Sequence, residues 1–244
     1  MNRRAFLSWG AAGTIGWLKG TKELRAASLA QNGVPYGESR LGVSDNERDA
    51  TLYVPKKYKE GTPMPVLMML HGFFGTGQGV RYTFPIAEDF GIIVIAPESR
   101  EITWGQSAPG FDQDVRYLGP AYRYVSGLLD VDEAQVALGG HSDGAGYALS
   151  MGLAYGDVFN HLMVFSGGLM IPVRRRGKPR IFFGHGIDDH QMPIDDTSRK
   201  FAAQLKTEGY DVTTREYAGG HGVSLPVVRE AFEWFLARDA KPHA

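Results

Sequence analysis

Short apolar runs alternate with amphipathic stretches along most of the chain, and this alternation restricts the possible folds more than any other feature. Two of the runs, residues 66–70 and 92–96, are apolar throughout, which is typical of strands buried on both faces of a sheet. The stretches between the runs have the spacing of helices with one buried face. Strands that alternate with helices predict the α/β class, with a mostly parallel central sheet and helices on both faces.

The individual elements follow from the same pattern. Strands are predicted over residues 51–54, 66–70, 92–96, 136–138, 162–165, 181–183 and 212–217. Helices are predicted near residues 79–90, 114–129, 144–155, 195–208 and 223–238. The longest region without a clear period, residues 98–113, predicts a long loop of the kind that often serves function. Since no linker or repeat divides the sequence, we expect a single domain over residues 31–244.

Residues 1–30 have the features of an export signal. The segment Arg3-Arg4-Ala5-Phe6-Leu7 resembles the bacterial twin-arginine signal, and the weakly apolar run that follows is too short to span a bilayer. The small residues of Ser28-Leu29-Ala30 suit cleavage before Gln31. An amphipathic helix or a membrane anchor is the alternative interpretation. The segment predicts a periplasmic or secreted protein that reaches its compartment through the export machinery and keeps no stable membrane span after signal removal.

Composition excludes several kinds of site. A net charge of −1 and a pI of about 6.7 argue against a dedicated nucleic-acid binder. The sequence contains no cysteine, so it cannot form a disulfide framework, a thiol nucleophile or a thiolate metal site. Any covalent catalysis must therefore use another side chain.

The segment Gly140-His141-Ser142-Asp143-Gly144 fits the pattern G-x-S-x-G. It follows the apolar run 136–138 and precedes the predicted helix 144–155, which is the strand–turn–helix setting of a nucleophile elbow. In such a turn the flanking glycines let the strand and helix pass closely, and the serine hydroxyl is exposed at a helix N-terminus. A glycine-rich helix start capped by Ser142 is the alternative. Ser142 is the candidate nucleophile.

A serine hydroxyl is a poor nucleophile near neutral pH and needs a base. In one known chain order of such sites the acid and then the histidine follow the serine. His221 lies in a glycine-rich segment after the strand 212–217 and before the last helix, where this order places the base. A histidine on a surface loop is the alternative interpretation. His221 is the candidate base.

The acid that orients the base is expected between Ser142 and His221, just past a strand. Asp188 and Asp189 follow the strand 181–183, and spacing alone does not choose between them. A rival interpretation combines the two aspartates with His185 and His190 as a metal site. Neither the histidine spacing nor a third distant ligand supports it, so we expect no metal.

An oxyanion hole needs two backbone N–H donors. Asp143, the residue after the nucleophile, supplies one, and the loop 71–77 after the strand 66–70 supplies the other, with Phe73 as the expected donor. The loop could instead bind phosphate, but neither a Lys-Ser/Thr pair nor a G-x-G-x-x-G pattern follows it.

With these motifs, residues 49–238 resemble an α/β-hydrolase of the small, lidless phospholipase/carboxylesterase group, with polyhydroxybutyrate-depolymerase-like and feruloyl-esterase-like exported esterases as neighbours. The resemblance rests on His71-Gly72, on the segments 140–144 and 185–193, and on His221. It implies that the triad acid is Asp189. Two residues depart from the family pattern: Asp188 is a second carboxylate beside that acid, and Asp143 stands where many relatives carry Gln or Met.

The resemblance implies a serine carboxylic-ester hydrolase that works through an acyl-enzyme without metal or organic cofactor. A thioesterase, amidase or peptidase on the same triad is one alternative, and a non-catalytic exported binding protein is another. The links after the strands 162–165 and 181–183 are too short for a helical lid, which favours small soluble esters with short acyl chains. Trp104 and Phe111 are expected either to line an aromatic substrate pocket or to pack their loop onto the sheet.

Overall fold

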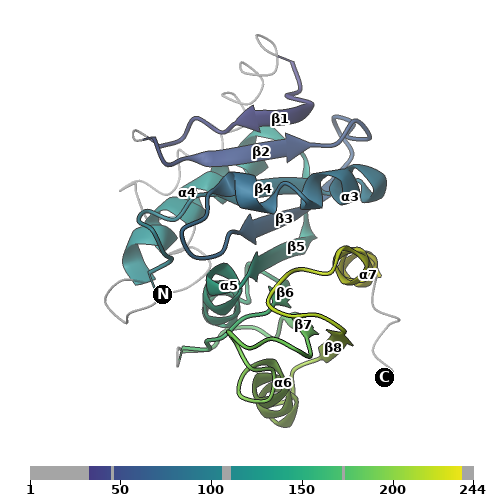
Figure 1. The fold of residues 1–244 in the computed structure, drawn as a ribbon. Helices are drawn as coiled ribbons and strands as arrows, with labels where there is room; N and C mark the ends of the chain where they lie inside the picture. Colours follow the sequence, from purple (N-terminus) through teal and green to yellow (C-terminus); the bar gives the residue numbers. More distant parts are fainter. Residues whose placement is uncertain (1–32, 45–46, 106–110, 172–173, 238–244) are drawn as a thin grey trace.

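A computed structural model describes residues 33–44, 47–105, 111–171 and 174–237. An eight-stranded sheet runs through the molecule in the order β1-β2-β4-β3-β5-β6-β7-β8 (Figure 1). The strands are β1 (Gly37–Arg40), β2 (Ala50–Val54), β3 (Met64–Leu70), β4 (Ile93–Pro97), β5 (Val131–His141), β6 (His161–Phe165), β7 (Arg180–Gly186) and β8 (Val212–Tyr217).

Six neighbouring strands of the sheet, β4-β3-β5-β6-β7-β8, are parallel to one another. At one edge, β2 runs antiparallel to both of its neighbours, β1 and β4. The carboxyl ends of the six parallel strands therefore meet at one edge of the sheet. In sheets of this kind ligands bind beside those carboxyl ends. The segments that follow these strands are the ones that position the candidate site.

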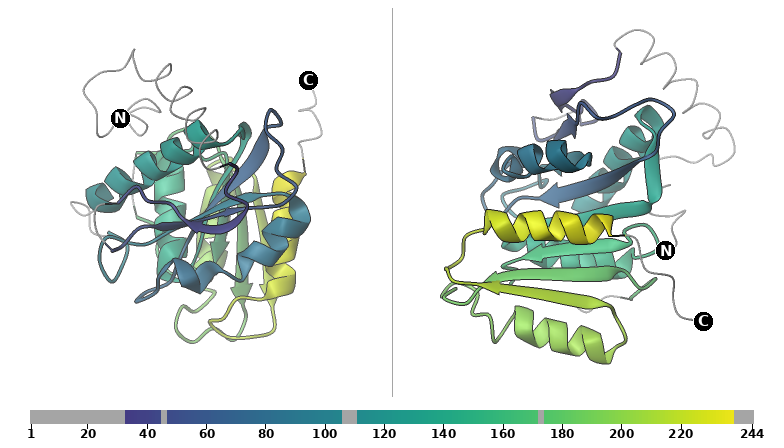
Figure 2. Two further views of the ribbon diagram at one scale, coloured as in Figure 1. Left: turned by 90° about the horizontal axis from the view of Figure 1, so that it is seen from above. Right: turned by 90° about the vertical axis from the view of Figure 1, so that its right-hand side faces the viewer.

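Helices cover both faces of the sheet (Figure 2). Two helices, α3 (Thr83–Phe90) and α7 (Leu225–Leu236), contact each other and pack on one face. The opposite face carries α4 (Phe111–Leu128), α5 (Asp143–Ala154) and α6 (Ser198–Thr207). Gly91 ends α3 with a left-handed φ of 69°, a conformation that glycine adopts without a steric penalty.

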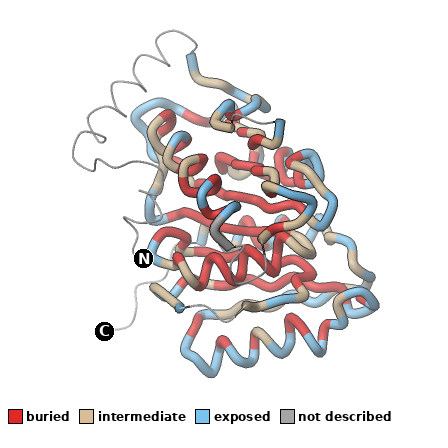
Figure 3. The backbone as a smooth tube through the Cα atoms, turned by 90° about the vertical axis from the view of Figure 1, so that its left-hand side faces the viewer, coloured by how far each residue is buried: buried red, intermediate tan, exposed pale blue. Residues whose placement is uncertain are grey.

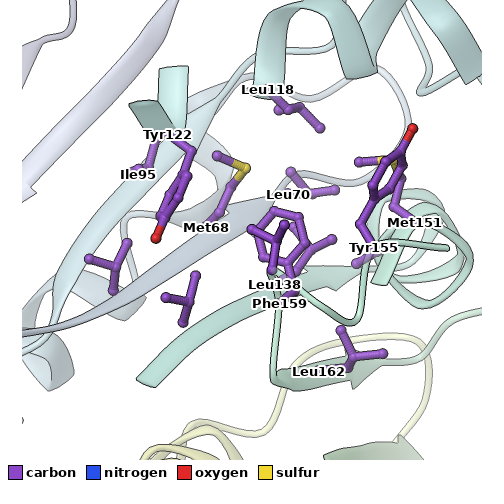
Figure 4. Close-up of a cluster of buried hydrophobic side chains, with 14 of the residues drawn as sticks. Met68, Leu70, Ile95, Leu118, Tyr122, Leu138, Met151, Tyr155, Phe159 and Leu162 are labelled. Atoms are coloured by element: carbon purple, nitrogen blue, oxygen red, sulfur yellow. The ribbon is translucent and has the colours of Figure 1, made fainter. Parts of the chain in front are cut away.

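The core consists of two hydrophobic clusters, one on each face, and the central strands are buried along most of their length (Figure 3). In the cluster beneath α4 and α5, side chains from four strands interdigitate with side chains from the helices and from the segment after α5 (Figure 4). Full burial of one such aliphatic or aromatic side chain stabilises the fold by about 1.5–3 kcal/mol. The continuous apolar character of the central strands follows from this burial on both faces.

The predicted α/β class is confirmed, and each of the seven expected strands is present. The sequence pattern missed β1, because this four-residue edge strand alternates half-buried and exposed residues and contains no apolar run. Strand β5 is longer than expected, beginning at Val131 and reaching His141. The helix expected near 79–90 is divided into a 3₁₀ turn, η1 (Gly77–Val80), and α3. Within the described ranges, the helices lack the length and hydropathy needed to cross a membrane.

Candidate active site

Ser142 lies between the last residue of β5 and the first residue of α5, at the carboxyl edge of the sheet. Its backbone has φ 56° and ψ −118°, a conformation that L-residues rarely adopt. The Ser142 N–H donates to the carbonyl of Phe165 at 2.9 Å, which ties the strained residue to the neighbouring strand β6. Such strain persists only where the surrounding structure holds it, and it is concentrated at functional sites.

Glycines on either side of Ser142 make this turn possible. A Cβ added at Gly140 would lie 2.3 Å from the carbonyl oxygen of Gly144, closer than real Cβ contacts come. A Cβ added at Gly144 would lie 2.3 Å from the carbonyl oxygen of His71. The G-x-S-x-G spacing is thus required by backbone packing between β5, α5 and the segment after β3.

A chain of hydrogen bonds joins three separate segments at this point. The Ser142 Oγ lies 2.8 Å from Nε2 of His221, which is in the segment between β8 and α7. The Nδ1 of the same imidazole lies 2.7 Å from Oδ2 of Asp189, which follows β7. The three residues expected from the sequence are therefore brought within hydrogen-bonding distance in the order serine, imidazole, carboxylate.

The two adjacent aspartates have different surroundings. Asp189 is buried, and its Oδ1 accepts hydrogen bonds from the N–H groups of Gln191 and Met192, both at 2.9 Å. Burial pushes the pKa of Asp189 up, but the hydrogen bonds from Met192, His221 and Gln191 outweigh it, and the pKa is lowered. Asp188 is exposed, and its N–H donates to Gly219. Only Asp189 contacts the imidazole.

Sequence reasoning missed a second histidine on the same carboxylate. The Nε2 of buried His185 lies 3.0 Å from Oδ2 of Asp189 and 2.9 Å from the carbonyl of Met192. Its Nδ1 lies 2.7 Å from the Ser198 Oγ. Burial lowers the pKa of His185, which favours the neutral ring in this position. The position of His185 four residues before Asp189 was the available signal, but spacing does not show a shared oxygen.

The rival metal site does not form. His185 and Asp189 bond to each other, whereas Asp188 and His190 are exposed. In the ranges that the structure describes, histidine and carboxylate side chains do not gather into any group of three able to hold a metal ion.

The loop after β3 approaches Ser142. A Cβ added at Gly72 would lie 3.5 Å from Cβ of Ser142. Residues 72–75 form a turn closed by the Gly75 N–H donating to the Gly72 carbonyl at 2.9 Å. Within the described ranges the Phe73 N–H, in this turn, donates to no backbone carbonyl. The N–H of Asp143 belongs to the first residue of α5, directly after Ser142.

His71 fixes this loop through hydrogen bonds of its imidazole ring. Its Nδ1 lies 2.8 Å from the Gly72 carbonyl, and its Nε2 lies 3.1 Å from the Ser99 N–H. The first contact requires a protonated Nδ1 and the second an unprotonated Nε2, so the ring is neutral. Burial lowers the pKa of His71 to about 4, in agreement with this tautomer.

The Asp143 side chain bonds the segment that follows β4. Its Oδ2 accepts hydrogen bonds from the Thr103 Oγ1 at 2.7 Å and the Trp104 N–H at 3.1 Å. Burial raises the pKa of Asp143, and these two hydrogen bonds oppose the rise. The carboxylate thus anchors the segment after β4 to the start of α5.

Trp104 does not line an open pocket, so the sequence-based expectation of a substrate wall is wrong for this residue. Its side chain is completely buried, with ring centroids 4.8 Å from His71 and 5.6 Å from Tyr147. Its indole N–H donates to the His71 carbonyl at 2.8 Å. It packs the loop onto the sheet, which was the alternative interpretation. Phe111 is the first residue of α4, and its side chain lies outside the described residues.

A further histidine contacts His221. The Nε2 of His141 lies 2.8 Å from the carbonyl oxygen of His221, and the two ring centroids are 5.3 Å apart. Burial lowers the pKa of His141, so the neutral ring donates its N–H to that carbonyl. The sequence pattern did not single out His141 beyond its place in the G-x-S-x-G segment.

The solved structures of similar fold include esterases and a hydrolase. The S-formylglutathione hydrolase FrmB from Staphylococcus aureus aligns with a TM-score of 0.62 and 16% identity over 77% of this chain and 92% of that chain. Esterase 2 from Thermogutta terrifontis, phosphonylated by cyclosarin, aligns with a TM-score of 0.65 and 16% identity over 84% and 97%. Esterase PE8 aligns with a TM-score of 0.57 and 21% identity over 76% and 99%. These likenesses show the α/β-hydrolase fold.

Comparison of the sequence with protein families is more specific. No curated protein matches the chain. A model of the family Esterase, described as "Putative esterase", matches residues 43–174, which is more than half of the chain and includes the loop after β3 and the nucleophile elbow. The chain therefore belongs to the Esterase family and is a serine hydrolase that acts on ester bonds.

Proposed function

We propose that the chain hydrolyses carboxylic esters through a triad of Ser142, His221 and Asp189. One observation carries the proposal: a serine in a strained left-handed turn has its Oγ 2.8 Å from an imidazole that bonds a buried carboxylate through its other nitrogen. This arrangement activates a serine hydroxyl and fixes the tautomer of its base. If Ser142 served only to pack the core or to cap α5, its backbone would not need this strained conformation.

The proposed reaction has two steps. The Ser142 Oγ attacks the ester carbonyl and its proton passes to Nε2 of His221, which then donates the proton to the departing alkoxide. Water attacks the acyl-enzyme and His221 takes a proton from the water. His221 then returns this proton to the Ser142 Oγ as the bond to the acyl group breaks and the carboxylic acid leaves. Asp189 stabilises the imidazolium in both steps. The N–H groups of Phe73 and Asp143 donate hydrogen bonds to the developing oxyanion.

The proposed substrates are small soluble esters with short acyl chains. The described parts of the link from β6 to β7 form no helix, and only residues 187–197 separate β7 from α6. Neither link provides a helical lid, and interface-activated lipases use such lids to shield a broad apolar surface. We expect nitrophenyl esters of two to four acyl carbons to be hydrolysed faster than those of twelve to sixteen. A rate that climbs toward the longest chains, with a jump at the onset of micelles, would contradict this part of the proposal.

A fluorophosphonate probe tests the triad itself. The wild-type protein should become labelled at Ser142, whereas Ser142→Ala and His221→Ala should remain unlabelled and inactive. Both variants should unfold at the same denaturant concentration as the wild-type protein. A non-catalytic binding protein would not react. Matched oxygen esters and thioesters of the same acyl group would separate an esterase from a thioesterase on the same triad.

We also propose that the protein is exported in folded form by the twin-arginine route. The support is the Arg3-Arg4-Ala5-Phe6-Leu7 segment, which lies outside the described residues. The absence of cysteine fits a chain that gains nothing from an oxidising compartment. Replacing Arg3 and Arg4 together by lysine should leave the precursor in the cytoplasm. Normal appearance of that variant in the periplasm would refute this proposal.

A further inference from the structure

Exposed apolar side chains are concentrated around the candidate active site. Among the described residues, eight large hydrophobic side chains are exposed, and six of them lie in segments that follow the carboxyl ends of the parallel strands. These six are Phe73, Phe74, Ile102, Leu169, Ile187 and Leu225. Ser142 lies at the same edge of the sheet, so these apolar residues and the position where an ester would react share that edge.

Phe73 and Phe74 form the most prominent part of this surface. They are 53% and 68% exposed, and their ring centroids lie 4.2 Å apart with the planes at 70°. The Phe74 N–H donates to the carbonyl of Ile102 at 2.9 Å, so the segment after β4 supports the pair. Aromatic rings attract further rings in edge-to-face and offset arrangements, and two exposed rings at this angle offer both an edge and a face.

The backbone of Phe74 is strained, and packing of its side chain into the core does not explain the strain. Its φ is 56°, at the third position of the turn that the Gly75 N–H and the Gly72 carbonyl close. Glycine or asparagine normally occupies a position of this kind, because a bulky residue there is sterically unfavourable. An exposed ring contributes little to the core. A phenylalanine at this position is therefore better explained by contact with a ligand than by stability.

The pair is close to the reacting atoms. A Cβ on Gly72 would be 3.5 Å from Cβ of Ser142, and the Cα of Phe74 is at most about 7.6 Å along the chain from that of Gly72. The same turn contains the Phe73 amide, which the proposed function assigns to the oxyanion. A group that binds the rings and a carbonyl that binds the amide can therefore belong to one small ester.

We propose that Phe73 and Phe74, supported by Ile102, form a subsite for an aromatic group of the substrate. The inference rests on the proposed function and deepens it, because it names esters that carry an aromatic ring as the preferred class. Trp104, which is buried, takes no direct part. The aryl group can belong to either half of the ester, since the rings lie beside the carbonyl position.

Isomeric esters test the subsite. Benzyl acetate has its ring in the alcohol, methyl phenylacetate has its ring in the acyl group, and methyl acetate has none. The quantity to measure is the ratio of kcat/KM for each ring-containing ester to kcat/KM for methyl acetate. We expect at least one ratio to fall about tenfold in Phe74→Gly, which corresponds to about 1.4 kcal/mol of lost aromatic contact. The isomer affected identifies the half of the ester that binds the rings.

Two further variants control the experiment. Phe74→Tyr keeps the ring and should keep the ratio, and Tyr124→Ala removes an exposed aromatic from α4 and should leave all rates unchanged. The Tm of Phe74→Gly should be no lower than that of the wild type, because glycine relieves the left-handed strain. Unchanged ratios in Phe74→Gly, or a lower Tm with equal losses on all three esters, would overturn the subsite. A wild-type protein that hydrolyses none of these esters and takes no fluorophosphonate label would instead refute the proposed function.

Discussion

Gly144 lies directly against the carbonyl of His71, so that a Cβ on this glycine would come within 2.3 Å of the carbonyl oxygen. The same Cβ would be 2.7 Å from the Leu70 carbonyl oxygen. The start of α5 and the end of β3 therefore touch through backbone atoms alone. This contact fixes the distance between the nucleophile turn and the loop that carries the Phe73 amide.

Gly144→Ala should therefore destabilise the protein, because rigid backbone rather than a flexible side chain blocks the new methyl group. Forcing an extra carbon into such a contact costs about 1–3 kcal/mol or more in free energy of unfolding. Gly79→Ala is a matched control, since its Cβ would meet nothing closer than Cβ of His71 at 3.9 Å. Guanidinium unfolding of both variants measures the difference, and equal stabilities would contradict the packing argument.

Two substitutions of Ser142 should separate strain from catalysis. Ser142→Ala and Ser142→Gly both remove the hydroxyl and should both abolish turnover. Glycine tolerates φ 56° and ψ −118°, whereas alanine keeps a Cβ in this unfavourable region. We expect Ser142→Gly to be more stable than Ser142→Ala by about 1 kcal/mol. A glycine variant less stable than the alanine variant would show that the turn is not strained.

Neutralising the two adjacent aspartates one at a time should affect kcat very differently. Asp189→Asn should lower kcat by about 10³–10⁴-fold, because the amide no longer holds His221 in the productive tautomer. Asp188→Asn changes an exposed side chain with no contact to the imidazole and should retain activity within about twofold. Steady-state kinetics on one nitrophenyl ester decides between the two. An inactive Asp188→Asn variant together with an active Asp189→Asn variant would show that Asp188, and not Asp189, orients His221.

Features that depend on local pattern were predictable from the sequence. Strand β8 occupies the expected residues 212–217, and the elbow forms where a strand meets a helix between glycines. Strand β1 was not predictable, because an edge strand paired on one side only needs no apolar run.

Side-chain roles that depend on distant partners were not predictable either. Trp104 is buried because His71 and Tyr147 enclose it, and nothing in the sequence near Trp104 indicates either contact. His185 shares an oxygen of Asp189 with His221, a residue that lies 32 positions beyond the aspartate. Such arrangements follow from the meeting of loops at one edge of the sheet, which the spacing along the chain does not encode.

Stability should fall on mild acidification because His71 is buried in its neutral form. Its pKa is about 4 in the folded protein against an ordinary value of 6.5. Between these values the unfolded chain binds a proton that the folded protein does not, so the contribution of His71 is complete above pH 6.5 and is lost as the pH falls toward 4. At pH 5 the loss amounts to about 2 kcal/mol by this linkage. Burial also lowers the pKa values of His141 and His185, which adds to the loss in the same direction.

The free energy of unfolding at pH 7.5 and pH 5.0 tests this account. The wild-type protein should be less stable at pH 5.0, and His71→Gln should show a smaller difference between the two conditions, whatever its stability at pH 7.5. His190→Gln removes an exposed histidine and should keep the wild-type difference. Because only the difference between conditions is compared, a general destabilisation by the glutamine does not affect the result. A His71→Gln variant with the full wild-type difference would show that another group causes the loss of stability in acid.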